Sequence, residues 1–243
     1  MAIHPSQRQE EQAVRDFLGG RTTGFFVEVG ANHATERSQT WHLEQLGWTG
    51  ILVEPQPDLA AALVAVRAAQ VFAVACSSPE NAGQSLPLHV DGIDGALSAL
   101  NRDRMAPGAQ PKRVILVPVR TLDSVLQEAE TPVPIDLLSV DVEGHEVEVF
   151  LGFDFQRWRP TLLLVEDHVN SLRTHHLLTA KGYRLIRRLG NNGWYVPAAA
   201  PVRVSVADRW EIVRKYYLAL PFRRLRNMWR DVRRQYADRR ARR

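Results

Sequence analysis

The stretch "GFFVEVGAN", residues 24–32, carries the clearest fold signal in this sequence. Residues 25–29, apolar except for Glu28, are typical of a buried β-strand, and Gly30 follows them in a turn. A glycine in such a turn lets a cofactor approach the backbone closely. The stretch therefore predicts a strand of an α/β domain, with a candidate ligand site where that strand ends.

Short apolar segments alternate with helical patterns along most of the remaining chain. Further strands are predicted within 49–57, 71–77, 135–142, 161–168, 183–190 and 192–198, with a strand pair near 86–90 and 113–119. Helices are predicted within 38–48 (capped by Ser38), 58–69 (capped by Asp58), 121–129, 146–153 and 171–182. This alternation indicates a doubly wound, mostly parallel sheet covered by helices on both faces.

The chain divides into three predicted parts: an N-terminal helix in 1–20, one α/β domain over 21–200, and a basic amphipathic helical tail over 201–243. The net charge of +4 is unevenly distributed, because residues 203–243 carry 14 Lys and Arg against 4 Asp and Glu. By subtraction from 31 and 27, residues 1–202 carry 17 and 23. The body is therefore mildly acidic, and a nucleic-acid-binding function should not be inferred from overall charge.

The cellular location is predicted from what the sequence lacks. Cys76 is the single cysteine, which excludes an internal disulfide framework and favours a reducing compartment. The polar start shows no secretory segment, and no apolar run approaches the roughly 20 residues of a membrane span. We expect a soluble cytoplasmic protein, with a peripheral membrane location left open by the basic tail.

Acidic side chains gather where the predicted parallel strands end. The sequences at these ends are "EVGAN", "EPQP", "CSS", "DVEGH" and "EDHVN", and four of the five contain a carboxylate. In doubly wound sheets, ligands bind beyond the carboxyl ends of the strands. These segments are therefore predicted to form one functional site.

The turn after residue 29 favours a nucleoside cofactor without phosphates. His33 and Thr35 stand where a dinucleotide fingerprint would place glycines, and no phosphate-binding loop is present. Glu54 ends the next strand, at about the spacing where an acid binds ribose hydroxyls. S-adenosylmethionine is the common cofactor of this kind. Its predicted contacts are Glu28, Gly30, Asn32, Glu54, Gln56 and Ser77.

Three stretches resemble the FkbM-type methyltransferase family: "FFVEVGAN…SQTWHLEQLGWTGILVEPQP", "VPVRTLDSVL" and "IDLLSVDVEGHEVEVFLGF". The resemblance covers roughly residues 24–196. It implies a Rossmann-like (class I) methyltransferase fold and S-adenosylmethionine-dependent O-methylation of sugars and natural products. The family's turn commonly reads G-A-N-[DI]-G, whereas this chain has His33 and Ala34 after Asn32. This departure leaves the path of the loop open.

The acids at the ends of two later strands form a metal hypothesis. Asp141 ends one strand, and Glu166 and Asp167 end the next. Carboxylates on adjacent strand ends can converge on a hard divalent cation such as Mg²⁺ or Mn²⁺. Methyltransferases of the catechol type are similar in using acids at these two strand ends for Mg²⁺. Without a metal, Asp141 or Glu166 would orient the catalytic base or bind substrate.

O-methylation also requires a group that accepts the proton of the hydroxyl. His145 follows Asp141 by four residues, and its unperturbed pKa near 6.5 suits a proton acceptor. We therefore predict His145 as the base, with Asp141 beside it and His168 as the alternative base. The role of Glu143 is left open, and Glu146 is expected to begin a helix, where carboxylates are favoured.

The tail is predicted to form an amphipathic basic helix. Its apolar residues recur every three or four positions and are Phe222, Leu225, Trp229, Val232 and Tyr236. Such a helix packs on the body or on a second copy in a homodimer, or it lies on an anionic membrane through residues 221–243. Nucleic acid is not an expected partner, since no recognised nucleic-acid module is present.

The combined prediction is a methyltransferase that acts on a hydroxyl of a sugar, oligosaccharide or related natural product. The alternatives are a nucleic-acid methyltransferase that uses the arginine-rich tail, and a non-catalytic module that binds a membrane or a protein partner.

Overall fold

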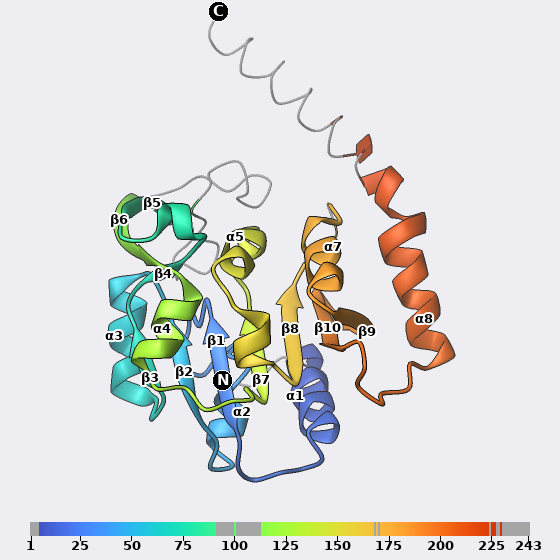
Figure 1. Ribbon diagram of the computed structural model, residues 1–243, viewed down its shortest axis with the longest axis horizontal. Coiled ribbons are helices and arrows are strands. Elements are labelled where there is room, and N and C mark those ends of the chain that lie inside the picture. Colours follow the sequence, from blue (N-terminus) through green and yellow to red (C-terminus); the bar gives the residue numbers. More distant parts are fainter. Residues whose placement is uncertain are drawn as a thin grey trace, which may run out of the picture.

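A seven-stranded sheet forms the centre of the computed structural model, with helices on both faces (Figure 1). The structure describes residues 5–90, 100, 113–167, 169, 171–223, 225–226 and 229. The strands lie in the order β3-β2-β1-β7-β8-β10-β9. Their bounds are β1 Phe25–Val29, β2 Thr49–Val53, β3 Gln70–Phe72, β7 Leu137–Val140, β8 Leu162–Glu166, β9 Tyr183–Leu189 and β10 Asn192–Pro197.

The sheet is mostly parallel, as predicted. β1 pairs in parallel with β2 on one side and with β7 on the other, and β7 pairs in parallel with β8. The last two strands form an antiparallel pair, and β10 lies between β8 and β9. The order of the strands therefore reverses between β1 and β7, which is where doubly wound sheets bind ligands.

Two groups of helices cover the two faces of the sheet. Helices α1 (Pro5–Phe17), α2 (Trp41–Glu44) and α3 (Pro57–Val66) pack on the face that includes Phe26 and Leu52. Helices α4 (Leu122–Glu128), α5 (Glu146–Leu151), α6 (Phe155–Trp158) and α7 (Arg173–Ala180) pack on the face that includes Val27. Because successive side chains of a strand point to opposite faces, β1 supplies both cores.

A smaller three-stranded sheet, in the order β4-β6-β5, lies beside the main one. Its antiparallel pair is β5 (Ser85–Val90) and β6 (Arg113–Arg120), which confirms the predicted strand pair. The single strand predicted within 71–77 is wrong. The chain leaves the main sheet after Phe72, and β4 (Ala75–Cys76) joins β6 instead. A short 3-10 turn, η1 (Pro79–Asn81), follows β4.

Both predicted helix caps differ from the observed ones. α3 has Gln56 rather than Asp58 at its N-cap, since Pro57 occupies the first helical position, where its fixed φ angle is favourable. α2 begins at Trp41 with Thr40 at its N-cap. The Ser38 hydroxyl accepts hydrogen bonds from the backbone N–H groups of Thr40 and Trp41, so it still holds the turn before this helix.

The C-terminal extension, residues 201–243, is helical in its described part from Val206 to Leu218, and α8 lies along the β9 edge (Figure 1). α8 (Val206–Ile212) continues directly into a π-helical segment, η3 (Val213–Leu218). Tyr216 and Leu220 are buried on this extension. Val232 and Tyr236, predicted for the apolar face, lie outside the described residues. Within the described part of the chain, no helix is long and apolar enough to span a membrane.

Candidate active site

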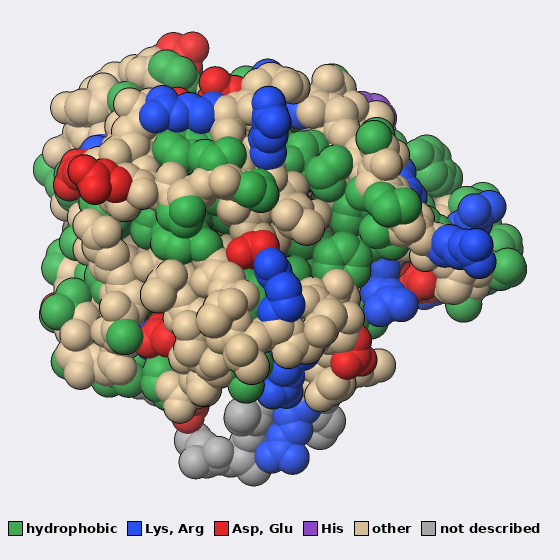
Figure 2. Space-filling model, turned by 60° about the horizontal axis from the view of Figure 1, so that its bottom comes forward, with side chains coloured by type: hydrophobic (Ala, Val, Ile, Leu, Met, Phe, Trp, Pro, Cys, Tyr) green, Lys and Arg blue, Asp and Glu red, His purple; other side chains and the backbone are tan. Residues whose placement is uncertain are grey.

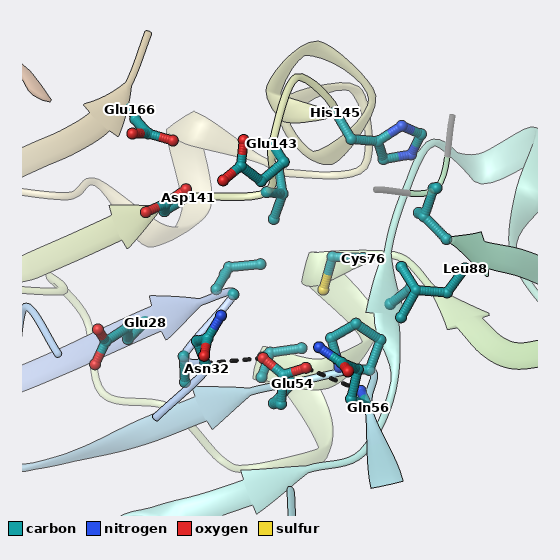
Figure 3. A pocket seen from close by; sticks show the side chains of 18 of the residues that line it. Glu28, Asn32, Glu54, Gln56, Cys76, Leu88, Asp141, Glu143, His145 and Glu166 are labelled. Atoms are coloured by element: carbon teal, nitrogen blue, oxygen red, sulfur yellow. Dashed lines mark hydrogen bonds between the residues drawn. The ribbon is translucent and has the colours of Figure 1, made fainter. Parts of the chain in front are cut away.

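A pocket of about 370 Å³ lies beyond the carboxyl ends of β1, β2, β7 and β8 (Figure 3). Its wall includes the turn after β1, the end of β2, the β4 residue Cys76 and the loop after β7. This is the edge at which the sequence placed the acidic strand ends. The volume falls within the roughly 300–1,000 Å³ of small-molecule sites.

Gly30 shapes the turn after β1. Its φ angle is +82°, and its N–H donates a 2.9 Å hydrogen bond to the Val53 carbonyl oxygen at the end of β2. A Cβ atom at this position would overlap the carbonyl oxygen of Asp141 at the end of β7. Only glycine therefore lets the backbones of three neighbouring strand ends come this close.

Glu54 links the turns after β1 and β2. Its Oε2 accepts a 2.8 Å hydrogen bond from the Asn32 backbone N–H, and its Oε1 accepts one of 2.9 Å from that of Gln56 (Figure 3). The residue is 3% exposed, and this burial raises the pKa of its carboxyl to about 7. Each carboxylate oxygen can accept a further hydrogen bond from a ligand.

Asn32 adds an unmatched polar atom to the pocket. It has a left-handed backbone conformation with a φ angle of +51°, which asparagine tolerates better than most residues. Its Oδ1 atom is buried and has no hydrogen-bond partner among the described residues. Buried polar atoms are nearly always hydrogen-bonded, so this oxygen is suited to a ligand donor.

Three carboxylates converge on the opposite side of the pocket. Oxygens of Asp141, Glu143 and Glu166 lie within 4.8 Å of one another. Burial, followed by repulsion from Glu166, raises the pKa of Asp141 well above its usual value. The same two causes, with Glu146 as a further neighbour, raise the pKa of Glu143 to about 7.

His145 lies at the N-cap position of α5, on the same loop. Its Nε2 is 2.9 Å from the Ser77 hydroxyl oxygen, which also accepts a 3.0 Å hydrogen bond from Asn81 Nδ2. On the other side of the ring, Nδ1 is 3.8 Å from a carboxylate oxygen of Glu148. The imidazole is therefore held at the pocket wall between a hydroxyl and an acid.

The sequence profile described as "Methyltransferase FkbM domain" matches residues 28–185, about two thirds of the chain. The chain belongs to the FkbM methyltransferase family. The matched region includes β2, β3, β7 and β8 of the main sheet completely, together with the end of β1 and the beginning of β9. With this strand order, the FkbM domain has a Rossmann-like class I methyltransferase fold.

Solved structures similar to the FkbM domain include the METTL16 methyltransferase domain, at a TM-score of 0.43 and 12% identity, covering 81% of this chain and 68% of that one. The N-terminal domain of human METTL16 in complex with S-adenosylhomocysteine (SAH) has a TM-score of 0.41 and 11% identity, covering 81% and 70%. The comparison with curated proteins gave no match.

Four of the six predicted cofactor residues of the FkbM domain line the pocket together, and the other two, Glu28 and Ser77, make hydrogen bonds within the protein. Gly30, Asn32, Glu54 and Gln56 line the pocket together. Glu28 also borders it, but its carboxylate accepts hydrogen bonds from the Ser38 hydroxyl, the Gln39 N–H and the Thr40 hydroxyl, and so holds the loop before α2. Ser77 is completely buried, and its hydroxyl contacts His145.

The predicted metal ligands are only partly brought together. Asp141 and Glu166 meet, but Asp167 has its oxygens turned to the Val169 N–H and to the Tyr216 hydroxyl. Glu143 takes the third place in the cluster. Consecutive residues at a strand end point to opposite sides, so Glu166 and Asp167 do not share a site. His168, the alternative base, lies outside the described residues.

Glu146 is the first residue of α5, as expected, and its Oε1 accepts a 2.8 Å hydrogen bond from the Gly144 N–H. The residue is 7% exposed, and burial raises the pKa of its carboxyl to about 7 from an ordinary 4.5. Folding therefore favours the protonated form. The stability associated with this group is fully present below about pH 4.5 and is lost as the pH rises through 7.

A Glu146→Gln variant is expected to change stability in a pH-dependent way. As the pH rises from 5 to 8, ionisation of Glu146 should lower the unfolding free energy of the unmodified protein by up to about 3 kcal/mol. The variant should not show this decrease, because glutamine does not ionise. Urea unfolding at several pH values measures this difference. Glu128→Gln, at an exposed position paired with Arg120, is the control and should parallel the unmodified protein. Parallel curves for Glu146→Gln would contradict the prediction.

Proposed function

We propose that this FkbM-family protein transfers the methyl group of S-adenosylmethionine to a hydroxyl of a sugar, oligosaccharide or related natural product. The observation that carries the proposal is the placement of Glu54 and Asn32 on one side of a single pocket, facing an acidic cluster and His145 on the other. The first side suits a nucleoside cofactor. The second suits an acceptor that must lose a proton.

The residues present fit this cofactor. The Glu54 carboxylate would accept hydrogen bonds from the ribose hydroxyls, and Asn32 Oδ1 would accept one from the methionine amino group. Cys76 forms an uncharged part of the pocket wall, because burial raises the pKa of its thiol to about 12. When bound, the cofactor supplies a methyl group on a positively charged sulfur.

Proton removal is assigned to His145. Its ring is oriented by Ser77, which Asn81 holds in turn. The Glu148 carboxylate, 3.8 Å from Nδ1, would stabilise the ring once it becomes positively charged. The remaining contribution of the site is to hold the acceptor hydroxyl in line with the methyl group.

A divalent cation such as Mg²⁺ or Mn²⁺ would be held by Asp141, Glu143 and Glu166. Hard cations prefer carboxylate oxygens, and these three residues can each offer one within a small space. The cation would lower the pKa of an acceptor hydroxyl and favour ionised carboxylates. Cation binding is therefore expected to release protons near pH 7, where Glu143 titrates.

Glu54→Gln is expected to weaken SAH binding by about 10- to 100-fold, since the glutamine keeps only one of the two acceptor oxygens. Because the carboxyl has a pKa of about 7 and accepts as a carboxylate, SAH affinity should rise about tenfold from pH 6 to pH 8. Isothermal titration calorimetry at both pH values measures these effects. The same pH slope in Glu54→Gln would show that another group is responsible.

The proposed function is tested by SAH calorimetry and by a screen with methyl-labelled S-adenosylmethionine. The acceptors are glycosides, oligosaccharides, polyhydroxylated natural products and single-stranded RNA, with EDTA or added Mg²⁺. Labelling of a hydroxyl compound supports the proposal, and labelling of RNA alone contradicts it. Absence of SAH binding would overturn the proposal. Full activity in EDTA would contradict only the proposed role of a divalent cation.

A further inference from the structure

The C-terminal extension presents a long apolar face to solvent. Trp210 is 60% exposed and Phe222 is 75% exposed, although such residues are ordinarily buried. The face consists of Val206, Trp210, Val213, Tyr217, Leu218, Phe222, Leu225 and Trp229, all of them exposed. Figure 2 shows hydrophobic side chains and Lys or Arg side chains gathered together on the projecting arm at the right.

The π-helical segment keeps this face continuous. From α8 into η3 (Val213–Leu218) the exposed apolar positions are 206, 210, 213 and 217, at helical spacing. From Leu218, the last residue of η3, the series continues one residue later, at 218, 222, 225 and 229. A π-turn contains one more residue than an α-turn, so the shift compensates for the wider turn. The spacing of the apolar residues thus keeps one continuous apolar face across the π-helical segment.

The opposite face of the extension is anchored to the methyltransferase domain. Tyr216 is completely buried, and its hydroxyl lies 3.2 Å from Arg188 Nη1 and 3.4 Å from a carboxylate oxygen of Asp167. Leu220 is buried on the same part of the extension. Because these contacts fix the orientation of the helix, the apolar face is directed away from the domain.

The charges beside the face indicate what it binds. Arg209 precedes Trp210 and Arg214, which is paired with Glu211, follows Val213, so the two exposed arginines flank the face on opposite sides. Residues 203–243 carry a balance of +10, from 14 basic and 4 acidic residues. Two such extensions would repel one another, which disfavours pairing with a second copy. Aromatic residues bordered by arginine are typical of helices that lie in the interface of an anionic membrane.

We propose that the C-terminal extension binds the methyltransferase to an anionic lipid surface. The apolar face enters the boundary between headgroups and acyl chains, and the flanking arginines remain at the level of the lipid phosphates. In Figure 1 the extension runs along the β9 edge toward the end of the sheet where the strands finish. The membrane is therefore bound from the side of the domain, through residues outside the pocket.

The test is sedimentation of the full chain with vesicles of phosphatidylcholine, alone or mixed with phosphatidylglycerol. We expect binding to the mixed vesicles that weakens as salt is raised, since the charges are screened. Trp210→Glu with Phe222→Glu should weaken partitioning by about tenfold or more for each aromatic removed. Val64→Glu is the matched control, because Val64 is 66% exposed on α3, away from the tail.

Other results would overturn the proposal. Equal partitioning of the double variant and the unmodified protein would show that the apolar face is not used. Equal binding to both kinds of vesicle would show that the anionic lipid and the flanking arginines do not contribute to binding. Failure of the unmodified protein to bind, with a dimer in sedimentation velocity that the double variant abolishes, would show that a second copy covers the face. Circular dichroism and SAH binding establish that the variants are folded.

Discussion

A Gly30→Ala variant is expected to lose measurable SAH binding and to unfold at a lower temperature than the unmodified protein. The added Cβ would overlap the Asp141 carbonyl oxygen, so the turn after β1 must separate from the end of β7. That movement disturbs the Asn32 N–H bond to Glu54 and the position of Asp141 together. Calorimetry with SAH and a thermal scan measure the two effects.

Gly83→Ala is the matched control for this variant. Gly83 has nearly the same φ angle, +80° against +82°, but has no neighbouring atom within 4 Å of an added Cβ. Both variants therefore carry the backbone strain of about 1–2 kcal/mol that alanine experiences in the left-handed region. Only Gly30→Ala adds the collision. Equal losses of stability and unchanged SAH affinity would mean that the close approach to Asp141 is not needed.

His145→Gln is expected to lower the turnover number for methyl transfer by about 10²- to 10⁴-fold, the usual contribution of a general base. SAH affinity should change little, because the imidazole lies against Ser77 and Glu148, whereas Glu54 and Asn32 are the residues proposed to bind the ribose and the methionine amino group. The measurement is the initial rate with a saturating acceptor found in the screen. A rate within a factor of two of the unmodified protein would remove His145 as the base.

Two further variants separate the base from its neighbours. Ser77→Ala removes the hydroxyl that orients the ring, so it should reduce the turnover number less than His145→Gln and shift its pH profile. Glu143→Gln tests the carboxyl whose pKa burial raises to about 7. If only Glu143→Gln shows the large loss, the proton acceptor is Glu143. If both show it, the histidine and the acidic cluster act on the same step.

The strands of the main sheet were predictable because their signal is local. Residues 25–29, 49–53 and 162–166 are mostly apolar and are bounded by turn residues, a pattern typical of buried parallel strands. The residues at their ends were predictable for the same reason, since every parallel strand ends at the same edge. The prediction failed within 71–77, where the chain continues apolar while it moves from one sheet to another. No local pattern distinguishes one continuous strand from two short strands in different sheets.

The contacts within the site were less predictable. Asp167 and Glu143 have equally acidic side chains near strand ends, yet only Glu143 joins Asp141 and Glu166. Its backbone adopts a left-handed conformation, with a φ angle of +51°, inside a turn that periodicity does not describe. The Ser77 hydroxyl, predicted as a cofactor contact, lies 2.9 Å from His145 Nε2, because the strand before it, β4, lies in the smaller sheet. The contact between Ser77 and His145 depends on how the smaller sheet packs beside the main one.

Residue order in this chain was sufficient to establish an α/β methyltransferase domain, a site at the carboxyl edge of its sheet, and a basic amphipathic tail. The α/β class, the site and the tail follow from the spacing of apolar residues and from the chemistry at strand ends, which are local, whereas the methyltransferase assignment rests on the resemblance of the motifs to the FkbM family. The partners of each acid, the orientation of His145 and the outward direction of the tail's apolar face emerged from the folded molecule. Each depends on segments distant in sequence, such as Ser77 with His145 and Tyr216 with Asp167, whose meeting is set by packing rather than by local preference.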